Sequence, residues 1–201
     1  VMAKNLFPET IDKISNELTP MVATARLIKQ EHPDASVVFI GPCASKKLEA
    51  SRRTVRSDVD FVITFEELTG MFEAKGILLD EIKAMDEMKD ATAAGRGYGV
   101  AGGVANAIKE CIEKYYPGTP VNIQHAESLA ECKKALLLAK AGKMNGCLIE
   151  GMACPGGCIA GAGTNIAIPV AARAVDKFKN EAEKKVPDES VDQEMVELEK
   201  E

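Results

Sequence analysis

The sequence predicts an α/β fold in which a mostly parallel sheet is flanked by helices. Short runs that contain β-branched and other apolar residues alternate with longer segments of helical periodicity, as they do in βαβ units. Glycine ends or follows two of these runs, and in one of them proline comes next, as expected where buried strands end. Since helices connect parallel strands, the alternation favours a parallel sheet.

The individual elements follow from this pattern. The predicted strands are residues 36–41, 60–64, 121–125 and 146–150, and the predicted helices are residues 20–31, 65–75, 99–116, 126–141 and 168–184. Thr19 and Thr64 stand where helix N-caps are expected, and Pro20 suits a first helical position. Gly76 predicts the end of the second helix.

Composition narrows the class of protein. The chain has 201 residues, of which 46% are hydrophobic and 28% charged, as is usual for globular proteins. A net charge of −6 provides no basic surface for nucleic acid. No apolar run reaches the roughly 18 residues that span a bilayer, and no signal peptide is evident, so we expect a cytoplasmic protein. We expect one domain over residues 1–186 and an acidic tail, frayed or disordered, over residues 187–201.

The six cysteines fall into two groups. Those inside helix or strand patterns are interpreted as small buried hydrophobic residues: Cys111, Cys132 and Cys147. Those at junctions between a strand and a loop, beside proline or glycine, are Cys43, Cys154 and Cys158. Because the carboxyl ends of parallel strands gather at one edge of a sheet, we expect Cys43 and Cys154 to lie at the same edge.

Cys154 and Cys158 enclose Pro-Gly-Gly, which leaves three interpretations. They are buried thiols on a tight turn, zinc ligands, or ligands of an iron–sulfur cluster. Zinc usually takes a second cysteine pair, and neither His32 nor His125 adjoins a cysteine. Iron–sulfur clusters accept variable cysteine spacing, and glycine lets backbone N–H groups approach the sulfides. The iron–sulfur interpretation is therefore favoured.

Two longer stretches make this interpretation specific. "GPCASKKLEA" (residues 41–50) and "GMACPGGCIAGAG" (residues 151–163) resemble the second and third signature loops of the catalytic domain of FeFe (iron-only) hydrogenases. "LTPMVATARLIK", "SDVDFVITFEEL" and "GYGVAGGVANAI" occur in the family's order. The resemblance extends to about residue 168. It implies an iron-hydrogenase-like α/β lobe and an oxidoreductase of anaerobic metabolism that reversibly reduces protons to dihydrogen. It also implies electron transfer from ferredoxin or an N-terminal iron–sulfur domain, and hydrogenase maturation proteins and the N-terminal remainder of the domain as further partners.

The resemblance implies an H-cluster, which is a 4Fe–4S cubane joined through a cysteine to a di-iron unit carrying CO, CN and a dithiolate. Cys43, Cys154 and Cys158 match three of its four cysteine ligands, and Cys158 matches the one shared with the di-iron unit. Lys46 matches a lysine that hydrogen-bonds a cyanide, a strong acceptor for an ammonium. Met152 matches a methionine that lines the di-iron pocket.

The resemblance also implies catalytic roles in proton transfer. Glu49 and Ser15 match residues of the family's proton pathway, which needs donors and acceptors at hydrogen-bond spacing. Lys46, Glu49 and Ser15 are therefore the three residues to which the resemblance assigns a catalytic role. Each residue also has an ordinary interpretation: a surface lysine, a surface glutamate and a serine near a helix end. For Met152 the ordinary interpretation is a core position.

The sequence departs from the family pattern in two ways. The first signature loop, which supplies the fourth cubane ligand and a proton-carrying thiol, is not found. We therefore expect these 201 residues alone to be inactive and the cluster to be absent or incomplete. Gly41 stands where methionine is common, and Ala162 where glycine is common, which points weakly to sensory branches. The alternatives are a redox or hydrogen sensor, an iron–sulfur-binding regulatory or assembly protein, and a metal-free relic.

Overall fold

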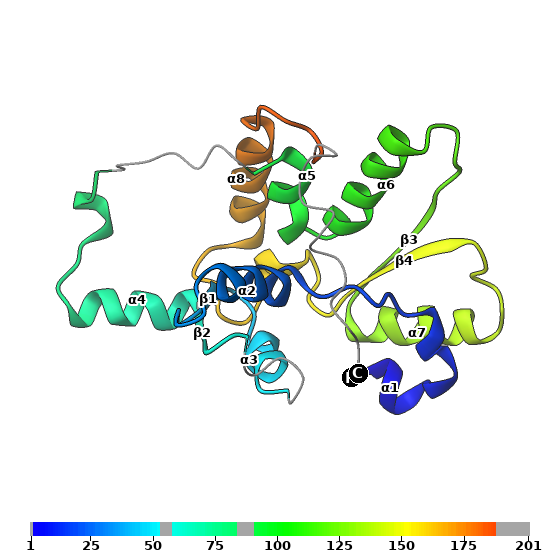
Figure 1. The fold of residues 1–201 in the computed structure, drawn as a ribbon, viewed down its shortest axis with the longest axis horizontal. Helices are drawn as coiled ribbons and strands as arrows, with labels where there is room; N and C mark the ends of the chain where they lie inside the picture. The colour runs from blue at the N-terminus through cyan, green and yellow to red at the C-terminus, as the bar shows by residue number, and fades with distance from the viewer. Residues whose placement is uncertain (1, 53–57, 84–90, 188–201) are drawn as a thin grey trace. The chain divides into compact units, whose positions relative to one another are not determined.

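The computed structural model describes residues 2–52, 58–83 and 91–187 (Figure 1). These residues form two compact units. Unit 1 contains the described residues within 1–15, 88–160 and 166–188, and unit 2 those within 16–87 and 161–165. The predicted α/β class is confirmed, because helices alternate with parallel strands. The predicted domain boundary before the acidic tail stays a prediction, because residues 188–201 lie outside the described part of the chain.

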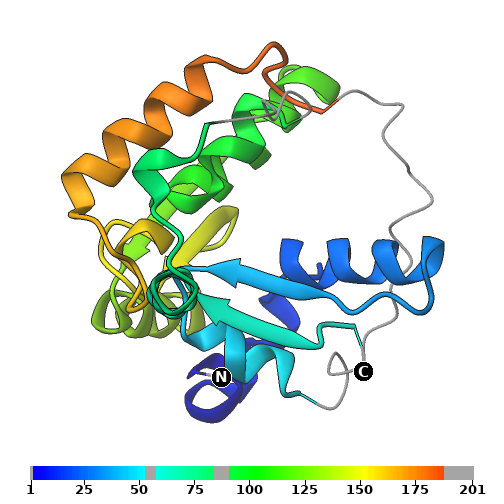
Figure 2. The same ribbon diagram turned by 90° about the vertical axis from the view of Figure 1, so that its left-hand side faces the viewer.

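Unit 2 is built on two parallel strands, β1 (Val38–Gly41) and β2 (Phe61–Thr64), which lie side by side in Figure 2. The register places Val38 opposite Phe61 and Gly41 opposite Thr64. Its helices are α2 (Pro20–Glu31), α3 (Ser45–Ala50), α4 (Phe65–Ala74) and the short 3-10 helix η2 (Leu79–Glu81). Its buried core consists of Met21, Val22, Ala25, Ala50 and Val59.

Unit 1 is built on the parallel strands β3 (Asn122–Glu127) and β4 (Cys147–Met152). The register ends with Glu127 opposite Met152. Its longer helices are α6 (Gly103–Tyr115), α7 (Leu129–Lys140) and α8 (Ile168–Asn180). Its shorter ones are α1 (Met2–Leu6), η1 (Pro8–Lys13), α5 (Ala93–Arg96), η3 (Gly97–Gly99) and η4 (Cys158–Ala160).

All four predicted strands are present, with ends that differ by at most two residues from the prediction. The expectation of one sheet is wrong, because the described strands form two separate two-stranded sheets. The alternation of strands and helices specifies that β1 pairs in parallel with β2, and β3 with β4. It does not specify whether the two pairs join. Within the described ranges, no helix is long and apolar enough to cross a membrane.

The helix ends show where the local predictions hold. Thr64 caps α4 through a reciprocal capping box with Glu67, and Gly76 beyond the helix has a φ of +67°. Thr19 precedes Pro20 at the start of α2, but its hydroxyl does not cap the helix; it donates to Glu49 instead. The helix predicted from residue 99 begins at Gly103. Residues 97–99 belong to η3 instead, and Gly102, the N-cap residue, has a left-handed backbone.

Candidate functional site

Cys154 and Cys158 stand at the two ends of a tight turn that follows β4, here called the cysteine turn (residues 154–158). The Gly157 N–H donates to the Cys154 carbonyl at 2.9 Å, and Gly156 has a φ of +93°. Proline followed by a residue of positive φ is the pattern of a type II β-turn. The Pro-Gly pair therefore accounts for the turn that separates the two thiols.

The neighbouring backbone requires glycine at position 157. A Cβ on Gly157 would lie 2.5 Å from the Ala101 nitrogen and 2.8 Å from the Gly99 oxygen. Val100 and Gly157 form an antiparallel bridge, and the Ala101 N–H donates to the Gly156 carbonyl at 3.0 Å. Close backbone approach of this kind permits only glycine.

This arrangement corrects one sequence interpretation. Glycine near the cysteines was expected to let backbone N–H groups approach the sulfides of a cluster. The Gly156 N–H instead donates to Glu127 Oε2 at 3.0 Å, and the Gly157 N–H to the Cys154 carbonyl. The two glycines therefore serve the fold of the turn itself.

The predicted cysteine ligands are divided between the two units. All six cysteines are thiols rather than disulfides, and all are half-buried. Cys43 follows β1 in unit 2, whereas Cys154 and Cys158 follow β4 in unit 1. Because β1 and β4 belong to different sheets, the prediction that Cys43 and Cys154 lie at the edge of one sheet is wrong. Within the described residues of either unit taken by itself, no group of three or more His, Cys, Asp or Glu side chains is placed to hold a metal ion.

The two signature loops nevertheless meet inside unit 2, because its residues 161–165 come from the end of the third loop. The Gly163 N–H donates to the carbonyl of Pro42, the residue before Cys43, at 2.9 Å. The Gly163 carbonyl accepts from the Glu66 N–H at 3.1 Å, and a Cβ on Gly163 would lie 2.4 Å from the Thr64 Cβ. The ends of both loops are thus fastened to each other and to the start of α4.

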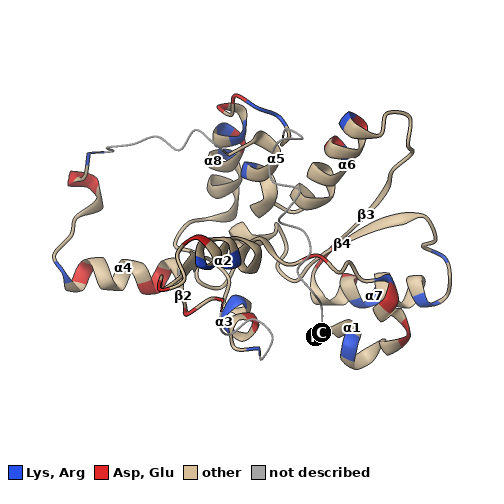
Figure 3. Ribbon diagram, in the orientation of Figure 1, with Lys and Arg blue, Asp and Glu red and all other residues tan. Residues whose placement is uncertain are grey.

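Lys46 and Glu49 lie one turn apart on α3, a helix that carries both basic and acidic residues in Figure 3. Lys46 Nζ is 2.8 Å from Glu49 Oε2, and the Thr19 hydroxyl donates to Glu49 Oε1. The side chains of Lys46 and Glu49 are only 21% and 20% exposed. A carboxylate held between an ammonium and a hydroxyl can take a proton from the ammonium, and the hydroxyl can pass a proton along by accepting one as it donates its own, which is the chemistry of a relay.

The other two predicted residues are in unit 1. Ser15 is exposed, and its role stays a prediction. Met152 is the last residue of β4 and is half-buried. Its carbonyl accepts a hydrogen bond from the Cys132 thiol at 3.7 Å, and its place beside a cofactor also stays a prediction.

Two of the cysteines assigned to packing have perturbed thiols. Burial raises the pKa of Cys111 and of Cys132 above the usual value for a cysteine. A raised pKa keeps these groups in the thiol form, which is neither the nucleophile nor the metal ligand. Their half-buried positions are less enclosed than the sequence suggested, but their chemistry agrees with a packing role.

Sequence reasoning gave no role to Glu150, a buried residue of β4 that is 8% exposed. Its carboxylate accepts hydrogen bonds from the N–H groups of Gly102, Val104 and Ala105, at 2.6, 3.0 and 3.2 Å. His125 Nδ1 lies 3.3 Å from Glu150 Oε2. The signal in the sequence is "GYGVAGG" before a helix, since a glycine-rich loop that leads into a helix N-terminus is suited to an anion. The anion is a side chain of the same chain.

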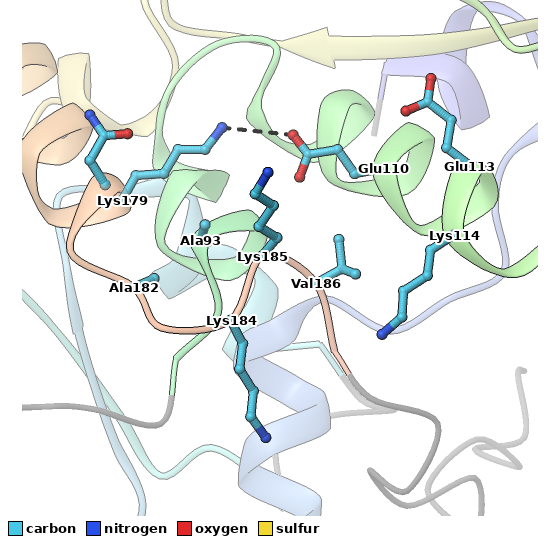
Figure 4. A pocket seen from close by; sticks show the side chains of 10 residues that line it. Ala93, Glu110, Glu113, Lys114, Lys179, Ala182, Lys184, Lys185 and Val186 are labelled. Carbon is cyan, nitrogen blue, oxygen red and sulfur yellow. Dashed lines mark ion pairs between the residues drawn. The ribbon is translucent and has the colours of Figure 1, made fainter.

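A cavity of about 750 Å³ lies in unit 1 (Figure 4). It is lined by α6, the end of α8 and the segment that follows α8, and its side chains include four lysines and two glutamates. Lys179 Nζ is 3.9 Å from Glu110 Oε1 across it. None of the predicted cysteines lines this cavity, so it is not the candidate cluster site.

Residues 1–162 match the protein family described as "Iron only hydrogenase large subunit, C-terminal domain". The chain belongs to this family. Among its iron-only hydrogenase relatives is the periplasmic [Fe] hydrogenase large subunit of Nitratidesulfovibrio vulgaris (strain Hildenborough), 27% identical over 217 residues. The match covers 87% of this chain and 51% of that protein. Iron hydrogenase 1 of Clostridium pasteurianum is 26% identical over 202 residues, which cover 80% of this chain and 35% of the relative. The chain therefore spans about half or less of these relatives.

A shorter match has a different name. The cytosolic Fe-S cluster assembly factor NAR1 of Kluyveromyces lactis is 39% identical over 69 residues, covering 34% of this chain and 15% of that protein.

Solved structures agree on the fold. A variant of the [FeFe]-hydrogenase HydA1 from Chlamydomonas reinhardtii has a TM-score of 0.70 at 20% identity, over 92% of this chain and 65% of the other. The structure of HydA(deltaEFG) has a TM-score of 0.69 at 21% identity, with the same coverage. The predicted resemblance to the iron-only hydrogenase fold is confirmed.

Proposed function

We propose that this chain is the cluster-binding C-terminal portion of the catalytic domain of an iron-only hydrogenase. The reaction is the reversible reduction of protons to dihydrogen, with electrons from ferredoxin or an N-terminal iron–sulfur domain. The observation that carries the proposal is the hydrogen bond from the Gly163 N–H to the Pro42 carbonyl. It joins the two loops that resemble cluster-binding loops, next to one of the predicted ligands.

The donor set fits an iron–sulfur cluster. Cys43, Cys154 and Cys158 would hold a 4Fe–4S cubane, since thiolates are the usual ligands of such clusters. When bound, the complete H-cluster supplies electron transfer and the site of proton reduction. Lys46 would donate a hydrogen bond to a cyanide ligand, and Met152 would line the di-iron pocket. These 201 residues carry three of the four cysteines that the family's cluster takes, so we propose that they do not turn over alone.

Proton movement is assigned to this chain's own side chains. Lys46, Glu49 and Thr19 form a continuous hydrogen-bonded series. The ammonium can give a proton to the Glu49 carboxylate, and the Thr19 hydroxyl can both donate and accept. Ser15 is proposed as a further member of this pathway.

The compartment and the partners are part of the same proposal. Six cysteines without a disulfide suit a reducing compartment, and we propose the cytoplasm. Ferredoxin or an N-terminal iron–sulfur domain would deliver electrons, and the N-terminal remainder of the domain and hydrogenase maturation proteins would complete the cluster. Cell fractionation tests the compartment, because one relative is named as periplasmic.

The experiment is to load the purified chain with iron and sulfide without oxygen, add a di-iron mimic, and record infrared spectra and hydrogen evolution. The proposal expects cluster absorption, CO and CN infrared bands, and little turnover. Lys46→Gln should shift the CN bands, whereas Lys47→Gln, on the same helix, should not. A chain that takes up no cluster would contradict the cofactor, and rapid hydrogen evolution would contradict the inactivity of these residues alone.

A second candidate is an iron–sulfur assembly or carrier protein that holds a cubane without a di-iron unit. The 39% identity with the Kluyveromyces lactis assembly factor over 69 residues favours it. The same infrared experiment separates the two functions. A loaded cubane with no CO or CN bands after addition of the mimic would support the assembly function.

A further inference from the structure

Glu150 is connected to the cysteine turn through the loop that it holds, here called the glycine loop (residues 97–103). Gly102 is the N-cap residue of α6 and has a φ of +83°, and no side chain at that position caps the helix. The Glu150 carboxylate accepts the N–H groups that open α6 instead. Since a helix N-terminus favours negative charge, the carboxylate fixes both the helix and the loop before it.

The glycine loop in turn supports the cysteine turn on one side. Ala101 donates its N–H to the Gly156 carbonyl, and Val100 bridges to Gly157. The backbones approach so closely that a single Cβ at Gly157 would overlap Ala101 and Gly99. A shift of the glycine loop therefore cannot be absorbed by compressible side chains, and the turn must move with it.

Glu127 supports the turn on the other side. Its Oε2 accepts the Gly156 N–H at 3.0 Å, and it is the last residue of β3, opposite Met152 of β4. The turn is thus held between a carboxylate at the end of β3 and a loop fixed by a carboxylate of β4. Both connections lie within unit 1.

We propose that Glu150 is a positioning residue that fixes the separation and orientation of Cys154 and Cys158 before any cluster binds. It acts through the glycine loop, whose N–H groups its carboxylate accepts. The consequence for cluster loading rests on the proposed function, whereas the geometry of the turn does not. A preformed turn accepts a cluster without the entropic cost of ordering two ligands.

The test is Glu150→Gln in the whole cluster-free chain, read as the alkylation rate of each cysteine by mass spectrometry. The variant preserves the size of the side chain but presents an NH₂ group where two oxygens accept three N–H groups. Loss of charge-assisted hydrogen bonds should raise the alkylation of Cys154 and Cys158 about tenfold. Cys111 and Cys147, in the same unit, should change by less than about twofold.

The matched control is Ser128→Ala. It removes another helix cap of unit 1, because Ser128 Oγ accepts the Glu131 N–H at 3.1 Å, but it does not touch the glycine loop. In the control, the alkylation rates of Cys154 and Cys158 relative to those of the other cysteines should stay unchanged. An equal rise at all four cysteines in Glu150→Gln would show that Glu150 is only structural. The proposal would also be overturned if the alkylation rates of Cys154 and Cys158 did not rise at all.

A second measurement uses the wild-type chain and stands even if the variant does not fold. Amide hydrogen exchange of residues 156–158 should match that of residues 102–105, because the proposal makes them one unit of local opening. The proposal would be overturned if the amides of residues 156–158 exchanged more than about a hundredfold faster than those of residues 102–105. Selective alkylation in a chain that takes up no iron would contradict the proposed function and leave the positioning role standing.

Discussion

Replacing Gly157 with alanine tests how closely the cysteine turn packs on the glycine loop. The new Cβ would lie 2.5 Å from the Ala101 nitrogen and 2.8 Å from the Gly99 oxygen, and the φ at this position is +88°. The left-handed backbone costs an L-residue about 1–2 kcal/mol. Forcing the backbones apart costs a further ~1–3 kcal/mol. Gly157→Ala should therefore lower the free energy of unfolding by about 2–5 kcal/mol.

The chain supplies a matched control for this experiment. Gly118 has the same φ of +88°, and a Cβ there meets nothing within 4 Å. Gly118→Ala should show only the cost of the left-handed backbone, about 1–2 kcal/mol. Urea unfolding of both variants and of the wild type measures the difference. Equal destabilisation by the two alanines would refute the close packing of the turn, and with it the support that it receives from the glycine loop.

Three further predictions concern unit 2. Thr64→Ala should lower the free energy of unfolding by about 1 kcal/mol, read from urea unfolding, because it removes the cap of α4; no change would mean that the capping box does not contribute. A hydrogen bond from Lys47 lowers the pKa of Glu67, so Glu67 contributes stability above its unfolded pKa that is lost as pH falls through its folded pKa. The free energies of unfolding of the wild type and of Glu67→Gln should therefore differ at neutral pH and converge in acid. A difference that is the same at every pH would contradict this. Thr19→Val should lower the free energy of unfolding by about 1–3 kcal/mol, read from urea unfolding, because Glu49 loses one of its two hydrogen-bond donors. An unchanged free energy of unfolding would argue against the Thr19–Glu49–Lys46 series.

The local elements could be predicted well because their signals are local. Val and Ile in short runs identified β1 and β2 to within two residues, and Thr64 with Glu67 three residues later is a recognisable capping box. The Pro155-Gly156 pair likewise specified the turn between Cys154 and Cys158. Each of these features depends on residues a few positions apart.

The features that the sequence did not reveal depend on residues far apart. Glu150 and Gly102 are 48 positions apart, and nothing local to either shows that one caps the other. Glycine beside the cysteines was expected to let backbone approach a cluster, whereas the neighbour of Gly157 is the backbone of residues 99–101. The number of sheets is also a long-range property, which alternation of strands and helices leaves open. The family resemblance named the candidate ligands, but their arrangement around a cluster stays a prediction.

The most direct test of the central claim is the iron and sulfide content of the reconstituted chain and of its single cysteine variants. The claim is that Cys43, Cys154 and Cys158 together bind a 4Fe–4S cluster. Cys111 is a half-buried cysteine outside the signature loops, and the Cys111→Ser variant should bind as much iron as the wild type. Cys43→Ser, Cys154→Ser and Cys158→Ser should each lose most of it. Full iron binding by any of these three variants, or equal loss in Cys111→Ser, would contradict the account.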